Sequence, residues 1–422
     1  MRRSWFLLTN RLRQLFLEQP LDPWAPPWLP RLGQSASAGV GRNGWGLASP
    51  GGEPQAFRSR LASPRVAEGH GVAMLPPDFS HQRYREINRD LAHFSDDQLE
   101  QHWLHHGQSE GRRYSGPSRS EFILAGKGKG DRGLEIAPYF TPIAAKRQGY
   151  NVQIVDVFDR PTLEKRAAED PDIPNGMIAN IEDVDFVGSA GDLRELIGDR
   201  IPAGSLAYIL SSHNFEHLPN PLRFLQDCEY YLAPTGLLSM AIPDLRCCFD
   251  FFQWPTMVEE WLAAEFQGQQ RLSAFDLFRA SCRRTNNFGK LDYPHQQIAL
   301  TGDLLTSFQQ LLLDVDGEPA EEYRDEHRSF FTPSSFRLLL SELQYLGLTG
   351  LEIVQLTDPI CNEFIVQLAP APAQQSWISP EEFGRQRRQL LFDTIDEISL
   401  KSPRQRLAAA NGSGAAPQAP SP

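Results

Sequence analysis

From residue 121 onward, short apolar runs alternate with segments of helical periodicity, and this alternation constrains the fold more than any other feature. Strand-length runs separated by helices are typical of a parallel sheet, so the pattern predicts an α/β fold. Two later runs, 351–356 and 362–368, lie too close together for an intervening helix, and we expect them to pair as an antiparallel hairpin. Residues 244–350 predict a helical insertion that caps the site. The four earlier runs are 134–137, 152–155, 206–210 and 237–242.

The two ends of the chain lack this pattern. Residues 1–76 are rich in Pro, Gly, Ser and Ala after a short apolar start, and predict a mostly disordered segment that begins with a short amphipathic helix. Asn10 and Arg11 keep that start far below the ~20 apolar residues of a transmembrane helix, so we expect at most peripheral membrane contact. Residues 371–401 predict a C-terminal helix, and 402–422 a disordered tail.

Charge and cysteine usage narrow the class of partner. The formal net charge of -12 disfavours binding to nucleic acid, which needs a basic face. The five cysteines are odd in number and form no CxxC pair, so we expect reduced thiols in a cytoplasmic protein and no metal site.

A small helical module is predicted at 77–116, with Tyr84, Leu99 and Trp103 among its apolar positions and Ser95 placed as a helix cap. Its sequence resembles a short bacterial repeat of the form "YLxxNPDL...HYxxHGxxEGR". That resemblance implies a glycan context and glycan-biosynthesis proteins as partners. The cluster of His102, His105 and His106 has two readings, a metal site or a solvated helix end, and we favour the second.

A literal GxGxxG at 128–133 permits a dinucleotide-binding interpretation, since it follows an apolar run and precedes Asp156 by about the usual spacing. A fingerprint of this kind opens a helix, whereas here the strand-like run 134–137 and Pro138 follow it. An NAD(P)-dependent oxidoreductase is therefore the least favoured alternative.

Three longer segments carry a more specific signal. LEIAPYFTPI at 134–143 resembles "LEIGPxxxPI", SLAYILSSHNFEHLPNP at 205–221 resembles "SFDxVxSSHVLEHxPDP", and LAPTGLLSMAIPD at 232–244 resembles "LKPGGxLxxxxPD". These are motifs of class I S-adenosylmethionine-dependent methyltransferases of the methyltransferase type 11 kind. The resemblance spans 121–370 and implies a Rossmann-like, seven-stranded α/β sheet with S-adenosylmethionine as cofactor.

The resemblance also implies which residues touch the cofactor. In the family, the acidic residue of the first motif lies near the cofactor's amino acid moiety, and the acid that ends the second strand accepts hydrogen bonds from the ribose hydroxyls. The chain departs from the pattern at Ala137, Ser189 and Ala207. The implied cofactor-binding residues are Glu135, Ile136, Ala137, Pro138, Asp156, Ala190, Gly191, Asp192, Ser212, His213 and Asn214.

Catalytic candidates are histidines. His213 follows the fourth strand and is either a general base or a residue that orders the loop, while His295 and His327 are candidate substrate contacts or ordinary surface histidines. Glu216 and His217 are interpreted as structural. We expect O-methylation of a glycan, sugar or other small-molecule acceptor, with a degenerate methyltransferase-fold scaffold as the alternative.

Overall fold

The computed structural model describes residues 75–88, 91, 93–108, 112–287, 297–316, 323–359, 362–371 and 378–399. All of them belong to one compact unit, Gly71–Pro422. The disordered segments and the amphipathic helix expected at the two ends lie outside the described residues. Within the described part of the chain, no helix has the length and apolar character needed to cross a bilayer.

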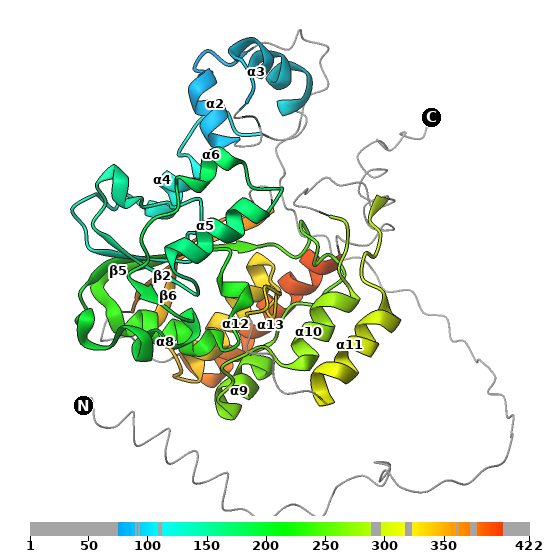
Figure 1. Cartoon of the computed structure of the whole chain (residues 1–422). Coiled ribbons are helices and arrows are strands. Elements are labelled where there is room, and N and C mark those ends of the chain that lie inside the picture. Colours follow the sequence, from blue (N-terminus) through cyan, green and yellow to red (C-terminus); the bar gives the residue numbers. More distant parts are fainter. Residues whose placement is uncertain are drawn as a thin grey trace, which may run out of the picture. The chain divides into compact units, whose positions relative to one another are not determined.

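Seven strands form one sheet in the order β3-β2-β1-β4-β5-β7-β6 (Figure 1). Strands β1 to β5 are parallel, and β7 runs antiparallel to both of its neighbours, so the expected hairpin is confirmed. This order, closed by an antiparallel pair, is the class I methyltransferase fold. The strands are β1 (Gly133–Ile136), β2 (Val152–Asp156), β3 (Phe186–Val187), β4 (Leu206–Ser212), β5 (Leu232–Pro243), β6 (Leu351–Leu356) and β7 (Glu363–Pro370).

Helices begin where the sequence supplies caps. Asp159, Asn220 and Thr332 each accept a hydrogen bond from the first turn of the helix that follows, and each of these helices carries a proline in that turn. The helices from residue 119 onward are α4 (Arg119–Leu124), α5 (Arg160–Glu169), α6 (Asn175–Ile178), α7 (Leu193–Ile197), α8 (Pro221–Tyr231), α9 (Val258–Gln267), α10 (Ala274–Cys282), α11 (Leu304–Asp316), α12 (Pro333–Tyr345) and α13 (Pro380–Ser399).

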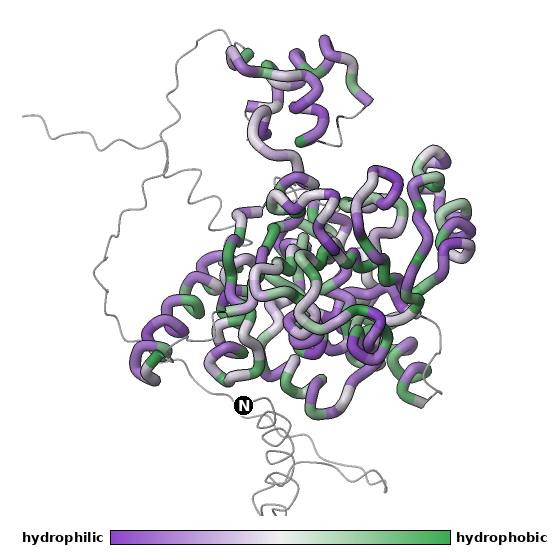
Figure 2. Tube along the Cα trace, turned by 90° about the vertical axis from the view of Figure 1, so that its left-hand side faces the viewer, coloured by the Kyte–Doolittle hydropathy of each residue, from purple (hydrophilic) through white to green (hydrophobic). Residues whose placement is uncertain are grey.

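Apolar side chains cover both faces of the sheet. One face packs against α7, α8, α9 and α12 and holds the larger cluster, which includes Trp261 and Phe336. The other face packs against α4 through Ile123 and Leu124. Figure 2 shows hydrophobic stretches gathered inside the unit and hydrophilic residues along its outer helices. Helices α9 to α12 lie between β5 and β6, which confirms the expected helical insertion.

The expected helical module is present as α2 (His81–Ile87), α3 (Asp96–His102) and a π-helical turn, Trp103–Gly107. Ser95 caps α3, as predicted, and Tyr84, Leu99 and Trp103 form its small core. The Nδ1 atom of His102 lies 3.0 Å from the Tyr84 hydroxyl. Among the described residues, the three histidines of this module do not form a group with metal-ligand spacing.

Candidate active site

The loop after β1 has an unusual backbone. Ala137 and Tyr139 both have φ of 47°, in the left-handed region that favours glycine. Ala137 stands where the family pattern has glycine, so the departure noted in the sequence falls on a position that requires glycine-like geometry. Strained residues of this kind concentrate at functional sites.

Glu135 holds the same loop. Its carboxylate is buried and accepts hydrogen bonds from the backbone amides of Ile143, at 2.6 Å, and Ala144, at 3.0 Å. Burial raises the pKa of this carboxyl group to about 7. The side chain thus shapes the loop in which Ile136, Ala137 and Pro138 lie.

Asp156 ends β2 at the same edge of the sheet. Its side chain is only 4% exposed, and one carboxylate oxygen accepts a hydrogen bond from the amide of Phe158 at 3.3 Å. Burial raises the pKa of Asp156 to about 6. The next strand, β3, leads into Ala190 and Gly191, which are buried.

Asp192 forms an ion pair with Arg223 at 2.6 Å. Its side chain makes no capping hydrogen bond to α7. Burial raises its pKa, while Arg223 opposes that effect.

The loop after β4 brings together charged groups. His213 has φ of 49°, and its Nε2 lies 2.9 Å from a carboxylate oxygen of Glu363. Burial lowers the pKa of His213, but Glu216 and Glu363 outweigh that effect and raise it to about 9. At neutral pH the ring is therefore protonated, which fits a loop-ordering role better than that of a general base. Asn214 donates a hydrogen bond to Ser211.

Sequence reasoning missed two residues of this network, Arg119 and Glu363. Arg119, on α4, donates to Glu363 at 2.7 Å and to Ser212 at 2.7 Å. Burial raises the pKa of Glu363, but hydrogen bonds from His213 and Arg119 lower it to about 2. No local signal marks this pair, because 244 residues separate its members in sequence.

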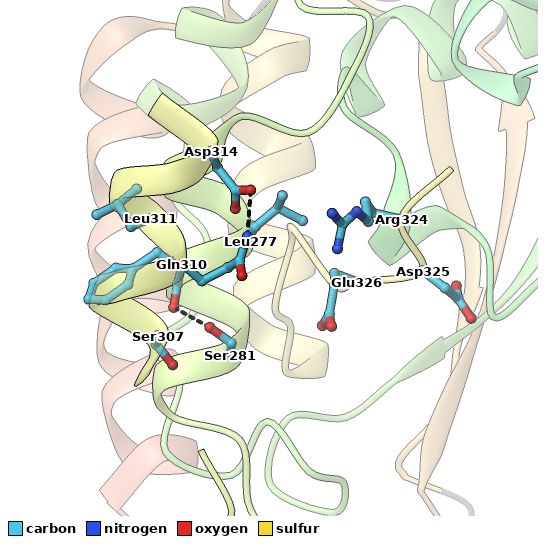
Figure 3. Close-up of a pocket in the computed structure, with 10 residues that line it drawn as sticks. Leu277, Ser281, Ser307, Gln310, Leu311, Asp314, Arg324, Asp325 and Glu326 are labelled. Atoms are coloured by element: carbon cyan, nitrogen blue, oxygen red, sulfur yellow. Dashed lines mark hydrogen bonds between the residues drawn. The ribbon is translucent and has the colours of Figure 1, made fainter. Parts of the chain in front are cut away.

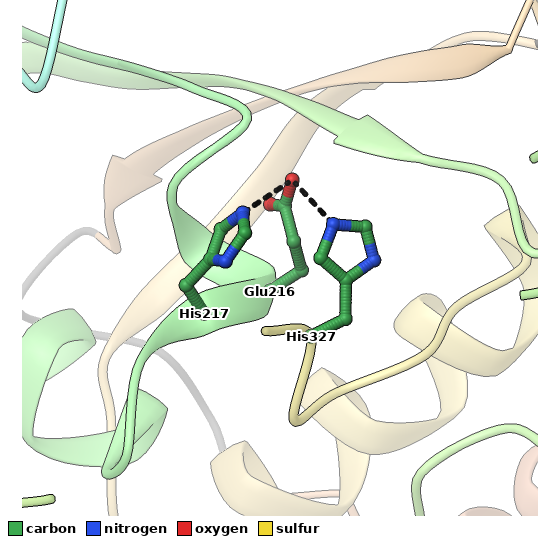
Figure 4. A group of neighbouring side chains, drawn as sticks. All are labelled: Glu216, His217 and His327. Carbon is green, nitrogen blue, oxygen red and sulfur yellow. Dashed lines mark ion pairs between the residues drawn. The ribbon is translucent and has the colours of Figure 1, made fainter. Parts of the chain in front are cut away.

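Glu216, His217 and His327 form a second group beside His213. Figure 4 shows both imidazole rings with a nitrogen directed toward the Glu216 carboxylate. His327 is buried and its Nδ1 lies 2.6 Å from Asp250, so it is neither exposed at the surface nor free to reorient. The other candidate substrate contact, His295, lies outside the described residues.

A small cavity of about 140 Å³ lies between α10, α11 and the segment before α12 (Figure 3). Leu277 and Leu311 line it on the helices, and Arg324, Asp325 and Glu326 line it on the segment. Its lining contains no residue of the loops after β1, β2 or β4, although the lining residue Asp325 lies 3.2 Å from Nδ1 of His217 in the turn after β4.

The GxGxxG stretch lies before β1, in the turn that follows α4. It neither follows a sheet strand nor opens a helix, which removes the structural context that a dinucleotide fingerprint requires. A Cβ added to Gly130 would meet nothing within 4 Å, whereas one at Gly133 would lie 2.0 Å from the Tyr208 ring. Gly133 is thus required by packing inside the fold.

No family model and no curated protein sequence matches the chain. Solved structures similar to it include a SAM-dependent methyltransferase from Aquifex aeolicus, with 13% identity over 60% of this chain and 90% of that chain and a TM-score of 0.29. The CcbJ methyltransferase from Streptomyces caelestis shares 10% identity over 60% and 94%, with a TM-score of 0.31. A putative Zn-dependent alcohol dehydrogenase from Rhodobacter sphaeroides shares 13% over 60% and 90%, with a TM-score of 0.34. Because these scores are low, the fold assignment rests on the strand order.

Proposed function

We propose that the chain is an S-adenosylmethionine-dependent methyltransferase that transfers a methyl group to a hydroxyl of a sugar, glycan or other small molecule. The observation that carries the proposal is the buried Asp156 at the carboxyl end of β2. The neighbouring strand in the sheet, β1, ends in the loop that contains the left-handed residues Ala137 and Tyr139. In a sheet of this order, ligands bind at the carboxyl ends of the strands.

The residues present suit the cofactor. Asp156 would offer carboxylate oxygens to the two ribose hydroxyls, and the loop after β1 would lie beside the amino acid moiety. Ala190 and Gly191 offer a small, buried surface for the adenine. When bound, the cofactor supplies an activated methyl group, and the protein positions the acceptor for in-line attack.

Two features of the sequence support a sugar or small molecule as the methyl acceptor. The net charge of -12 disfavours nucleic acid as a substrate, and the resemblance of the N-terminal module to glycan-associated repeats favours a sugar. The protonated His213 is suited to hold the loop through Glu363.

Calorimetric titration with S-adenosylmethionine, S-adenosylhomocysteine and NAD tests this function. We expect micromolar binding of the two adenosyl ligands and at least a tenfold loss in Asp156→Ala. The control is Asp172→Ala, because Asp172 is an exposed loop carboxylate and its removal leaves the affinity unchanged.

Failure to bind any of the three ligands would support the alternative, a methyltransferase fold that serves as a scaffold. The left-handed Ala137 is the observation that favours that alternative, since its methyl group occupies the place of a glycine. NAD binding alone would restore the oxidoreductase reading.

A further inference from the structure

Three side chains that are not among the implied cofactor-binding residues converge on one point. The Oε1 atom of Glu216 lies 3.7 Å from Nε2 of His217 and 3.8 Å from Nε2 of His327. The three atoms all lie within 4.8 Å of one another. Glu216 and His217 come from the short turn after β4, and His327 from the segment before α12 (Figure 4).

The carboxylate at the centre has imidazole rings around it but no hydrogen bond from a described residue. Glu216 is 1% exposed, and neither of its oxygens makes a hydrogen bond within the described part of the chain. The two imidazole nitrogens are too distant for hydrogen bonds, but their spacing leaves room for an ion between them and the carboxylate. A buried carboxylate without hydrogen bonds is costly unless positive charge compensates its own charge. The protonated His213, with Nδ1 3.5 Å from the same oxygen, supplies part of that positive charge, and a metal ion would supply the rest.

The far sides of both rings face carboxylates. Nδ1 of His327 lies 2.6 Å from Asp250, and Nδ1 of His217 lies 3.2 Å from Asp325. Histidines that bind metal commonly donate their other ring N–H to a carboxylate, which fixes the tautomer and directs the free nitrogen at the ion. His327 has that arrangement, whereas Nδ1 of His217 faces Asp325 without forming a hydrogen bond within the described part of the chain.

Backbone hydrogen bonds fix the two segments to each other. The amides of Arg328 and Ser329 donate to the carbonyl of Glu216 at 2.8 and 3.1 Å. The ligand atoms are therefore held together by the fold as well as by their own attraction.

We propose that Glu216, His217 and His327 bind a divalent transition-metal ion of the Zn²⁺ class. Two imidazole nitrogens and one carboxylate favour such an ion over Mg²⁺ or Ca²⁺, which prefer oxygen ligands alone. Metal–ligand distances of about 2.0–2.2 Å place tetrahedral ligand atoms about 3.4 Å apart. The two pairs at 3.7 and 3.8 Å must therefore close by a few tenths of an ångström, and the two imidazole nitrogens, which lie within 4.8 Å, by up to about 1.4 Å through side-chain torsions. Three protein ligands leave a coordination position open, as in catalytic zinc sites.

The site lies beside the loop after β4. Nδ1 of His213 is 3.5 Å from the same Glu216 oxygen. This position places a Lewis acid next to the loop where an acceptor hydroxyl would meet the methyl group. That use of the ion rests on the proposed function, whereas the binding of the ion does not.

The test uses the full-length chain, stripped of metal with a chelator and dialysed, and titrated with Zn²⁺ by calorimetry and with Co²⁺ by visible absorption. We expect one ion per chain. Glu216→Gln and His217→Gln should each weaken binding by at least about a hundredfold, and Asp250→Asn by about 10–100-fold. The control is His105→Gln, which removes a histidine of the N-terminal module and leaves the affinity unchanged.

Absence of stoichiometric binding to the wild-type chain would overturn the proposal, as would wild-type affinity in Glu216→Gln. Circular dichroism reports whether each variant folds. If Glu216→Gln is unfolded, the partly exposed His217 decides the question through His217→Gln. These metal titrations contain no adenosyl ligand. Binding of S-adenosylhomocysteine is measured separately, in the presence of chelator. Failure of the metal site and failure of the proposed function are therefore distinguishable.

Discussion

Buried carboxyl groups on the two halves of the sheet edge have pKa values shifted in opposite directions. On the β1–β2 side, Glu135 and Asp156 are buried and form no ion pair with a described residue, and burial raises their pKa values to about 7 and about 6. On the β4–β7 side, Glu216 and Glu363 are just as buried, yet three histidines lower the pKa of Glu216, and His213 and Arg119 lower that of Glu363, to about 2 in each case. Burial alone therefore does not decide the charge of an acid in this site.

The difference separates two kinds of recognition. The carboxylates of the β1–β2 side accept hydrogen bonds from neutral donors, which suits backbone amides and ribose hydroxyls. The carboxylates of the β4–β7 side are matched to positive charge, which suits an ion-pair network and, as proposed above, a metal ion. The following variants test whether this division holds.

The largest effect is expected from Arg119→Ala. Arg119 and Glu363 have side chains only 21% and 5% exposed, so removal of the arginine leaves a buried carboxylate with His213 as its remaining cation. We expect a loss of about 3 kcal/mol in the free energy of unfolding, measured by denaturant titration.

The matched control is Arg83→Ala, which removes an arginine paired with the exposed Glu121. Exposed ion pairs contribute little, so the denaturant midpoint should hardly change. Equal losses in the two variants would show that the β4–β7 network is no more than a surface ion pair.

A smaller effect is expected from the ionisation of Asp156. Its pKa of about 6 means that the carboxylate predominates at pH 7 and is protonated as the pH falls through 6. Only about a tenth remains ionised at pH 5, so the affinity for S-adenosylhomocysteine should be about tenfold lower at pH 5 than at pH 8. Calorimetric titrations at intervals of one pH unit measure this change.

Asp156→Asn is the control for that dependence. The amide does not titrate, so its weaker binding should be the same at pH 5 and pH 8. A pH-independent affinity in the wild-type chain would argue that Asp156 does not meet the ribose, and a pH-dependent one in the variant would assign the titration to another group.

The strands were largely predictable from sequence, because a buried parallel strand must be a continuous apolar run. The run at 134–137 is shifted by one residue from β1, and the run at 152–155 ends one residue before β2 does. Strand β3 was not predicted, because two residues, Phe186 and Val187, cannot show a period.

Residues of the candidate site were predictable from sequence only where they belong to a continuous sequence motif. Asp156 and the loop after β4 follow strands directly, so their placement at one edge follows from the parallel sheet. The contacts of Glu363 with Arg119, and of His327 with Asp250, join residues 244 and 77 positions apart. Such pairs depend on tertiary structure and leave no periodicity in the sequence. Glu216 and His217 are adjacent in the sequence. That His327 joins them in one group could be recognised only from the fold.

The smallest effect is expected from Ala137→Gly, which restores the glycine of the family pattern on the β1–β2 side. Ala137 has φ of 47°, where an L-residue costs roughly 1–2 kcal/mol and glycine does not, although glycine also gains about 0.5–1 kcal/mol of freedom in the unfolded chain. The net gain in the free energy of unfolding should be up to about 1 kcal/mol, measured by thermal melting. Ala125→Gly, with φ of 49° at the end of α4, should give a similar gain without altering S-adenosylhomocysteine binding, and Ala145→Gly, with φ of -65°, should give a loss. If Ala137→Gly also tightens the ligand, the methyl group obstructs the cofactor; a loss of stability at both left-handed alanines would mean that the backbone there is not strained.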